Sequence, residues 1–246
     1  MKTKTDRPER LDKLLAHAGF GSRKEVKNLL AQGQVTYLGE VVKDPKLMFS
    51  SNQLGDILCS NKPLRSYANS VFMLHKPAGY LSALSDAHAP TIADLLPAHL
   101  QKCQLSPVGR LDKDTTGLLL LTNDGQLSHR LTSPKWHVAK IYVVTTAGLP
   151  WSDTETELFA AGLTLSNGST CLPAELNIVS DHCVELTLYE GKFHQVKLMC
   201  SQVERPVLTL HRKQVATLVL DESLKPGELR ELTDLEASTL RRQVEL

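Results

Sequence analysis

The stretch Gly109-Arg110-Leu111-Asp112-Lys113-Asp114-Thr115-Thr116-Gly117 gathers charges, hydroxyls and glycines immediately before a wholly apolar run, residues 118–121. That run is followed by Asn123-Asp124-Gly125, so it predicts a short buried strand that ends in a turn. A loop that joins a rigid strand can hold a carboxylate firmly while the carboxylate faces solvent or substrate. The segment therefore predicts a core strand with a candidate catalytic site at its start.

The two carboxylates of this stretch admit several interpretations. Asp112 and Asp114 are two residues apart, so they share a face if the chain is extended. They can form an acid/base pair of the kind used by glycosidases, or one of them alone can be functional. Alternatively, this is a polar loop whose aspartates cap backbone N–H groups. Spacing alone leaves all three open.

The rest of the chain after residue 71 alternates strands with helices. Residues 140–144 and 184–188 have the two-residue period of half-buried strands. Helices are expected at 126–131 and 194–202, and Thr233 with Glu236 forms a capping box that opens a terminal helix. This order predicts an α+β domain with a mixed, mainly antiparallel sheet and flanking helices, rather than a regular βαβ alternation.

The first sixty residues predict a smaller, separate domain. Apolar residues recur at helical spacing over 11–18, and Ser22 with Glu25 forms a capping box for a second helix that Gly33 ends. Short strands are expected on both sides of Gly39. The polar stretch 61–70 lacks periodicity and is interpreted as a linker. The expected domains are therefore 1–60 and 71–246.

Basic residues surround the predicted start of that second helix. Free N–H groups at a helix N-terminus, here capped by Ser22, favour phosphate when cations lie nearby. A basic surface of this kind supplies affinity for RNA without reading its sequence. Alternatively, these are ordinary solvated charges, partly offset by Glu9, Asp12 and Glu25. The candidate RNA-binding cations are Arg10, Lys13, Arg23, Lys24 and Lys27.

Composition restricts the class of protein. The chain has 246 residues, a net charge of +1 and 41% hydrophobic residues, which suits one small and one medium globular domain. It has no apolar run near the roughly 20 residues that span a bilayer, and its first residues lack the apolar core of a signal peptide. The five cysteines form no CxxC pair, so we expect reduced thiols in a cytoplasmic protein, with no metal site.

The small domain resembles a known RNA-binding family. Arg10-Leu11-Asp12-Lys13-Leu14-Leu15, then Gly21-Ser22-Arg23-Lys24-Glu25-Val26, then Gly33-Gln34-Val35 resemble an S4 domain. That family is a small RNA-binding module, so the resemblance implies that the basic helices contact RNA. One departure is Leu38 before Gly39, where the family often has Asn in the turn.

The larger domain resembles a second family. The Gly-Arg-Leu-Asp sequence 109–112, with the stretch 116–125, is similar to the signature of RsuA-like pseudouridine synthases. His75-Lys76-Pro77-Ala78-Gly79, Lys140-Ile141-Tyr142 and the segment 190–199 resemble three further motifs of that family. His75 replaces the usual Asn, and Leu198 and Ala216 also depart from the family pattern.

This second resemblance implies roles for individual residues. Asp112 is expected to be the catalytic carboxylate, Tyr142 to stack on the target base and Lys197 to pair with Asp112, while Asp114 has no catalytic role. Without the resemblance, Tyr142 is more simply a core aromatic and Lys197 a solvated lysine. Isomerisation needs no redox step or group transfer, so neither cofactor nor metal is expected. Further expected RNA contacts are Lys76, Arg110, His194, Gln195 and Arg212.

The same resemblance suggests a substrate. Phe193-His194-Gln195 resembles the small-subunit type of the family, so we expect a single uridine of small-subunit ribosomal RNA, naked or in an assembly intermediate, to be isomerised by a monomer. A large-subunit rRNA or tRNA synthase, and a non-catalytic RNA-binding or ribosome-assembly factor, are the alternatives.

Overall fold

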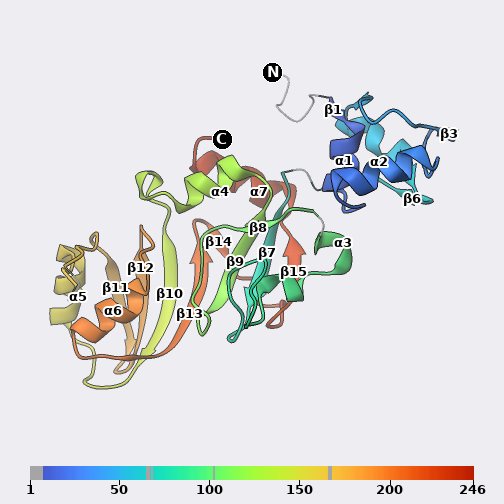
Figure 1. Ribbon diagram of the computed structural model, residues 1–246. Coiled ribbons are helices and arrows are strands. Elements are labelled where there is room, and N and C mark those ends of the chain that lie inside the picture. The colour runs from blue at the N-terminus through green and yellow to red at the C-terminus, as the bar shows by residue number, and fades with distance from the viewer. Residues whose placement is uncertain (1–7, 65–66, 68, 102, 166–167) are drawn as a thin grey trace. The chain divides into compact units, whose positions relative to one another are not determined.

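The computed structural model of this protein describes residues 8–64, 67, 69–101, 103–165 and 168–246 (Figure 1). The chain divides into two compact units. The first comprises residues 1–70 with 96–105, and the second comprises 71–95 with 106–246. The basic helices lie in the first unit and the Asp112 loop lies in the second.

The first unit packs two helices against short strands around one apolar core. A two-stranded pairing joins β1 to β4, and a four-stranded sheet has the order β3-β2-β5-β6. Residues such as Leu15, Val26 and Ile57, each 0% exposed, form the core. The elements are β1 (Glu9–Arg10), α1 (Leu11–His17), α2 (Arg23–Ala31), β2 (Val35–Tyr37), β3 (Glu40–Val41), β4 (Met48–Phe49), η2 (Ser51–Asp56), β5 (Ile57–Cys59), β6 (Lys62–Pro63) and α3 (Ala98–Gln101).

Local signals in this unit agree with the sequence. The backbone N–H of Ser22 donates to the Glu25 carboxylate at 2.7 Å, and Ser22 Oγ accepts from the Glu25 N–H at 3.4 Å, which confirms the capping box. The turn between β2 and β3 also forms. Leu38 and Gly39 both have positive φ there, 50° and 87°, a backbone that Asn-Gly adopts more easily than Leu-Gly.

The segment expected as a linker begins as part of this unit. β6 pairs with β5 across the two-residue turn Ser60-Asn61, whose φ angles are both positive. Leu64 is 3% exposed and belongs to the apolar core. Residues 65, 66 and 68 lie outside the described residues. The turn residues were interpreted as the start of a polar linker because a two-residue hairpin leaves no periodicity to detect.

The second unit is built on a nine-stranded sheet within the described residues. Its main order is β11-β12-β10-β13-β9-β7-β15, with β14 paired to β13 and β8 to β9. The elements are β7 (Val71–Lys76), η3 (Ile92–Leu95), β8 (Ser106–Pro107), β9 (Thr116–Thr122), α4 (Gly125–Thr132), η4 (Pro134–Trp136), β10 (Lys140–Thr146), α5 (Asp153–Ala161), β11 (Glu175–Ser180), β12 (Cys183–Leu188), α6 (Gln195–Gln202), β13 (Val207–Val215), β14 (Leu218–Val219), β15 (Leu229–Glu231) and α7 (Asp234–Gln243).

The pairing confirms a mixed, mainly antiparallel sheet. β9 and β13 run parallel and the other described pairs of the sheet are antiparallel. The expected buried strand is β9, in which residues 118–121 are at most 1% exposed. The strands expected at 140–144 and 184–188 are β10 and β12, and the three expected helices are α4, α6 and α7.

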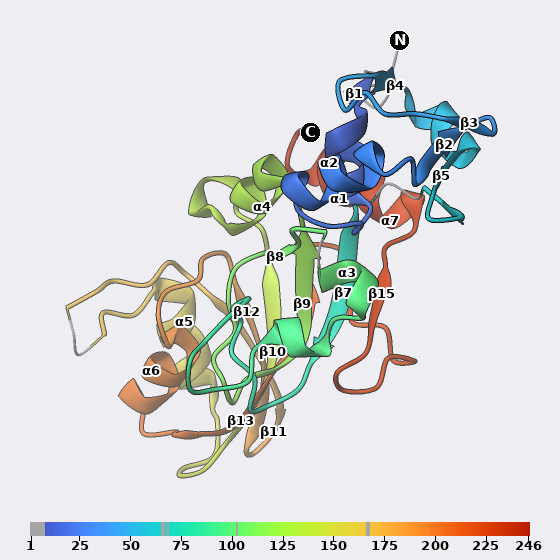
Figure 2. The same cartoon turned by 45° about the vertical axis from the view of Figure 1, so that its right-hand side comes forward.

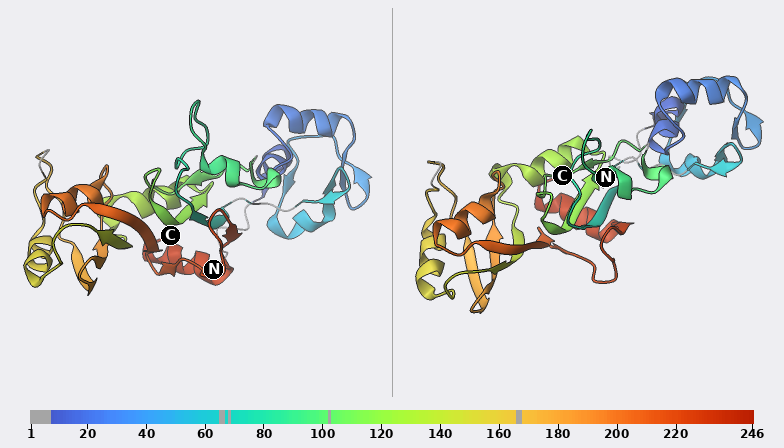
Figure 3. Two further views of the ribbon diagram at one scale, coloured as in Figure 1. Left: turned by 90° about the horizontal axis from the view of Figure 1, so that it is seen from below. Right: turned by 60° about the horizontal axis from the view of Figure 1, so that its bottom comes forward.

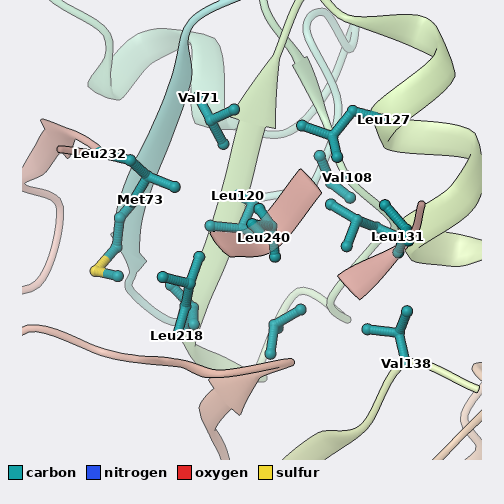
Figure 4. Close-up of a cluster of buried hydrophobic side chains, with 13 residues drawn as sticks. Val71, Met73, Val108, Leu120, Leu127, Leu131, Val138, Leu218, Leu232 and Leu240 are labelled. Atoms are coloured by element: carbon teal, nitrogen blue, oxygen red, sulfur yellow. The ribbon is translucent and has the colours of Figure 1, made fainter. Parts of the chain in front are cut away.

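Helices cover the sheet in two groups. α4 and α7 pack near β7 and β9, and α5 and α6 lie beside β11 and β12 (Figures 2 and 3). Leu127 and Leu131 of α4 and Leu240 of α7 meet Leu118 and Leu120 of β9 in one apolar cluster (Figure 4). The longest helix of the described residues, α7, has 10 residues, and none of these helices could cross a lipid bilayer.

Candidate active site

The Asp112 loop joins β8 to β9 and is held against a neighbouring strand. Gly117, at the start of β9, has a φ of 107°, and a Cβ there would lie 2.3 Å from the Arg212 carbonyl oxygen. Only glycine permits this close approach of β9 to β13. The residue therefore fixes where the loop ends.

Lys76 anchors the loop from the end of β7. Its Nζ lies 3.1 Å from the Asp112 carbonyl oxygen, 2.8 Å from that of Thr115 and 3.3 Å from that of Lys113. The side chain is 0% exposed, and this burial lowers its pKa from 10.5 to about 8, although Asp114 and Asp112 act in the opposite direction. The expected RNA contact of Lys76 is therefore corrected: the side chain positions the loop.

Two further contacts hold the loop from the segment after β7. The Ser82 hydroxyl donates to the Leu111 carbonyl oxygen at 2.8 Å and accepts from the Leu111 N–H at 3.0 Å. The Gly79 N–H donates to the Lys113 carbonyl oxygen at 2.7 Å. Ser82 was missed by sequence reasoning, since a lone serine 29 residues before its partner gives no local signal.

The side chain of Asp112 faces a pair of basic side chains from α6 and its N-cap. Lys197 Nζ lies 3.2 Å from Asp112 Oδ2, and His194 Nε2 lies 3.6 Å from Asp112 Oδ1. Asp112 is 26% exposed, so it is partly shielded yet open to a substrate. The structure thus brings together the two residues whose pairing the family resemblance implied.

Lys197 also binds the second aspartate of the loop. Its Nζ lies 2.6 Å from Asp114 Oδ1, closer than to Asp112. Burial alone would lower the pKa of Lys197, but the hydrogen bonds to Asp114 and Asp112 raise it above its usual value. The hydrogen bond from Lys197 also lowers the pKa of Asp114. Asp114 therefore shares the cation, a contact that the sequence did not indicate.

Tyr142 lines a narrow recess that ends at Asp112. The burial of β10 alternates, so that Lys140, Tyr142 and Val144 point to one face of the sheet. Tyr142 is 8% exposed and lines a cavity of about 70 Å³ together with Asp112 and Thr115. An aromatic face and a carboxylate therefore border the same space.

Arg212 lies across from Tyr142 on β13 but is buried. It is 2% exposed, its Nε donates to the Leu118 carbonyl oxygen at 2.8 Å, and its Nη2 has no partner among the described residues. The expected RNA contact of Arg212 is therefore corrected: the side chain is buried and holds the backbone of β9. Alternation along β13 places this side chain inward, although its charge suggested the opposite.

A second and larger cavity borders the same carboxylate. It measures about 560 Å³ and is lined by residues 109–113 and 191–194, with Leu81 and Ser82. Arg110 and His194, both exposed, line this cavity and the narrow recess as well. Asp112 thus lies where the two spaces meet.

The start of α6 is fixed by a buried amide. Gln195 is 4% exposed; its Nε2 donates to Glu190 Oε1 at 2.8 Å, and its Oε1 accepts from the Lys192 N–H at 2.9 Å. Because the amide nitrogen and the amide oxygen are both hydrogen-bonded within the protein, the expected RNA contact of Gln195 is corrected: the side chain anchors the start of α6. His194 precedes it in the left-handed region, with a φ of 52°.

In the first unit, two of the expected RNA-binding cations pair with carboxylates. Arg10 binds Asp12 through two hydrogen bonds of 3.0 and 2.9 Å, and Lys13 lies 2.6 Å from Glu9. The hydrogen bonds from Arg10 lower the pKa of Asp12. Part of the charge of these two side chains is therefore offset, as the alternative interpretation of the sequence supposed.

The other expected contacts of this unit surround the start of α2. Arg23, Lys24 and Lys27 are exposed, and Ser22 holds the helix cap through its hydroxyl. Exposed cations beside a helix N-terminus suit phosphate groups. Their role in RNA binding stays a prediction.

Comparisons with known proteins agree with this arrangement. The model of the RNA pseudouridylate synthase family matches residues 70–202, and that of the S4 domain matches residues 9–54. A Yersinia pestis protein named ribosomal small subunit pseudouridine synthase A is 40% identical over 94% of this chain and 97% of its own length. The Pseudomonas aeruginosa protein of the same name is 42% identical over 91% of this chain and 96% of its own.

A solved structure supports the same assignment. The crystal structure of a pseudouridylate synthase is 39% identical in sequence, covers 94% of this chain and 99% of its own, and superposes with a TM-score of 0.66. The family model alone spans more than half of the chain, and the relatives match along nearly their whole length. This chain therefore belongs to the RNA pseudouridylate synthases and carries an S4 domain near its N-terminus.

Proposed function

We propose that this RNA pseudouridine synthase isomerises a uridine of small-subunit ribosomal RNA and that Asp112 is its catalytic carboxylate. The observation that carries the proposal is the Lys197–Asp112 pair, 3.2 Å apart, at a recess lined by Tyr142. A positioned carboxylate beside a cation and a flat aromatic face is what the reaction requires.

The reaction breaks the bond between the base nitrogen and the ribose, turns the base and joins its carbon to the same ribose carbon. The proton released from that base carbon balances the proton gained by the nitrogen, so no electrons or groups leave the substrate. Asp112 acts as a nucleophile or as a base at the ribose, and either role needs the ionised carboxylate. Neither a cofactor nor a metal enters these steps.

Lys197 and Tyr142 have distinct tasks in this scheme. Lys197, whose own pKa is raised, stays protonated at neutral pH and holds a positive charge 3.2 Å from Asp112 Oδ2. The target uridine must leave its helix to reach Asp112, and Tyr142 offers a ring on which the extruded base stacks. Such stacking is worth about 1–3 kcal/mol per base.

The choice of substrate rests on the relatives and on one segment. The Yersinia and Pseudomonas proteins that share 40% and 42% identity with this chain carry small-subunit names. Phe193-His194-Gln195 agrees with that type. Arg110 and His194 border Asp112 from exposed positions, and Arg23, Lys24 and Lys27 add a basic helix start, so both units offer RNA contacts.

The test is pseudouridine mapping on small-subunit rRNA, naked and in assembly intermediates, after treatment with wild type, Asp112→Asn or Asp153→Asn. Asp153 is an exposed aspartate of α5 and serves as the matched control. Conversion of one uridine by wild type and Asp153→Asn alone supports the proposal. Conversion only in large-subunit rRNA or tRNA would replace the substrate, and conversion in no RNA would favour a non-catalytic ribosome-assembly factor.

The working state of the protein is also part of the proposal. We propose a cytoplasmic monomer; Asp112, Tyr142 and Lys197 all come from one chain, so the site needs no second copy. Sedimentation of the purified protein at micromolar concentration should give the mass of a single 27.2 kDa chain. A dimeric mass would contradict this, and fractionation of cells of the source organism would test the compartment.

A further inference from the structure

Phe193 is an aromatic residue whose exposure is unusual. It is 81% exposed, more than any other large apolar side chain of the described residues, and its ring stacks on that of His194 with centroids 3.8 Å apart. A single exposed apolar residue needs no explanation by itself. This one, however, lines the 560 Å³ cavity that Asp112 also borders.

We propose that this cavity is a second nucleotide subsite, in which a base next to the target uridine stacks on Phe193. The inference rests on the proposed function, because the target uridine is taken to occupy the recess beside Tyr142. That recess measures about 70 Å³, whereas the neighbouring cavity falls within the range of about 300–1,000 Å³ typical of ligand pockets. An RNA strand entering at Asp112 therefore finds room for a further nucleotide there.

The loop that presents Phe193 is anchored before any RNA arrives. Glu190 and Gln195, 5% and 4% exposed, hydrogen-bond to each other at 2.8 Å on either side of it. The Lys192 N–H adds a bond of 2.9 Å to Gln195. A platform fixed in this way loses little conformational freedom when a base binds, so the affinity gained by stacking is retained.

Cations complete the subsite. Arg110 and Lys113 are exposed and line the same cavity, and neither has an ion-pair partner in the part of the chain that the structure describes. Unpaired cations around an aromatic face are the combination that binds single-stranded nucleic acid. The base thus stacks on Phe193 while its phosphate meets Arg110 and Lys113.

The subsite is joined to the catalytic carboxylate through one residue. His194 stacks on Phe193 and its Nε2 lies 3.6 Å from Asp112 Oδ1. A base held on the free face of Phe193 is therefore separated by one ring from the residue that contacts Asp112. The neighbouring nucleotide would help to select the uridine that reacts. Only a strand that places the uridine beside Tyr142 and its neighbour on Phe193 is held by both aromatic rings.

The experiment measures the dissociation constant of a synthetic RNA centred on the uridine that the wild type converts. Phe193→Ala should weaken binding about 5- to 150-fold, the range expected for one lost stacking contact. Phe193→Tyr should bind within about twofold of wild type, because it keeps the ring. Phe193→Leu should bind as weakly as Phe193→Ala, and Leu235→Ala, which removes a 72% exposed leucine from α7, should change nothing.

A second set of RNAs tests whether Phe193 meets a flanking base. Each RNA carries one abasic site, in place of either the nucleotide before the uridine or the nucleotide after it. At one position the abasic RNA should weaken wild-type binding by the same factor as Phe193→Ala, and the two changes together should add no further loss. Additive losses at every position, or equal binding by Phe193→Leu and wild type, would overturn the subsite and indicate a simple apolar contact. If the wild type converts no uridine in any RNA, the proposed function fails as well.

Discussion

The cations at the start of α2 in the first unit and two cations of the second, Lys76 and Arg212, are chemically alike but lie in opposite environments. Arg23, Lys24 and Lys27 extend from the start of α2 into solvent. Lys76 and Arg212, by contrast, are 0% and 2% exposed, and both donate to backbone carbonyl oxygens. We expect the exposed cations to serve RNA binding, whereas Lys76 holds the Asp112 loop and Arg212 holds the backbone of β9.

Among the cations, the largest expected effect comes from removing a buried one. Lys76→Met keeps the length of the side chain but leaves the carbonyl oxygens of Asp112, Lys113 and Thr115 without their common donor. We expect the single-turnover rate to fall about 100-fold, because a displacement of about 1 Å at a catalytic group costs that much. Lys225→Met, at an exposed lysine of the same unit, is the control. Unchanged rates in both variants would refute the positioning role.

The same lysine predicts a dependence of stability on pH. Burial lowers its pKa from 10.5 to about 8 in the folded protein, so between these values the unfolded chain binds more protons. The free energy of unfolding of the wild type, minus that of Lys76→Met, should therefore rise by about 2 kcal/mol from pH 7.5 to 10. Denaturant titrations at several pH values measure this difference. If the difference in free energy of unfolding stays constant or falls with pH, the pKa of Lys76 is not lowered in the folded protein.

An exposed cation should instead affect binding. Lys24→Met is expected to weaken RNA binding and to reduce the slope of log affinity against log salt by about 0.7–0.9, the contribution of one phosphate contact. At saturating RNA the single-turnover rate should stay near that of wild type. Lys46→Met, at another exposed lysine of the first unit, should leave the slope unchanged. If both variants behave alike, the basic start of α2 is no RNA contact and its charges are merely solvated.

The smallest effect concerns the turn in the first unit. Leu38 has a φ of 50° and is 68% exposed, so a leucine occupies a left-handed position that asparagine tolerates better. Leu38→Asn should raise the free energy of unfolding by about 0.5–1 kcal/mol. Leu235→Asn removes an equally exposed leucine from a helix and should bring no gain. A loss of stability in Leu38→Asn would show that the leucine makes a contact the turn needs.

Local patterns predicted most of the elements and the family. The capping boxes at Ser22 and Thr233, the apolar run of β9 and the alternation of β10 are signals carried by neighbouring residues, and each formed as expected. The resemblance to the pseudouridine synthases, which rested on several ordered motifs, is confirmed by the comparisons. The two-residue turn at Ser60-Asn61 was missed because it looks like any polar linker.

Burial of charge could not be predicted, since it depends on partners far along the chain. Lys76 meets carbonyl groups 36 to 39 residues later, and Arg212 meets one 94 residues earlier. A lysine or arginine in a strand gives no sign of such pairing, so the sequence predicts RNA contacts for both. The pairing of Lys197 with Asp112 was expected only through the family resemblance, because the two residues are 85 positions apart.

The most direct test compares the two aspartates that share Lys197. Lys197 Nζ lies 3.2 Å from Asp112 and 2.6 Å from Asp114, so distance alone favours Asp114, whereas the proposed function assigns the reaction to Asp112. Single-turnover conversion of the target uridine should be measured with Asp112→Asn and Asp114→Asn. We predict no pseudouridine with Asp112→Asn and conversion within about tenfold of wild type with Asp114→Asn, which leaves the reacting carboxylate in place. Conversion by Asp112→Asn would contradict the assignment of Asp112. If Asp114→Asn were inactive at the same time, Asp114 would be the catalytic carboxylate instead.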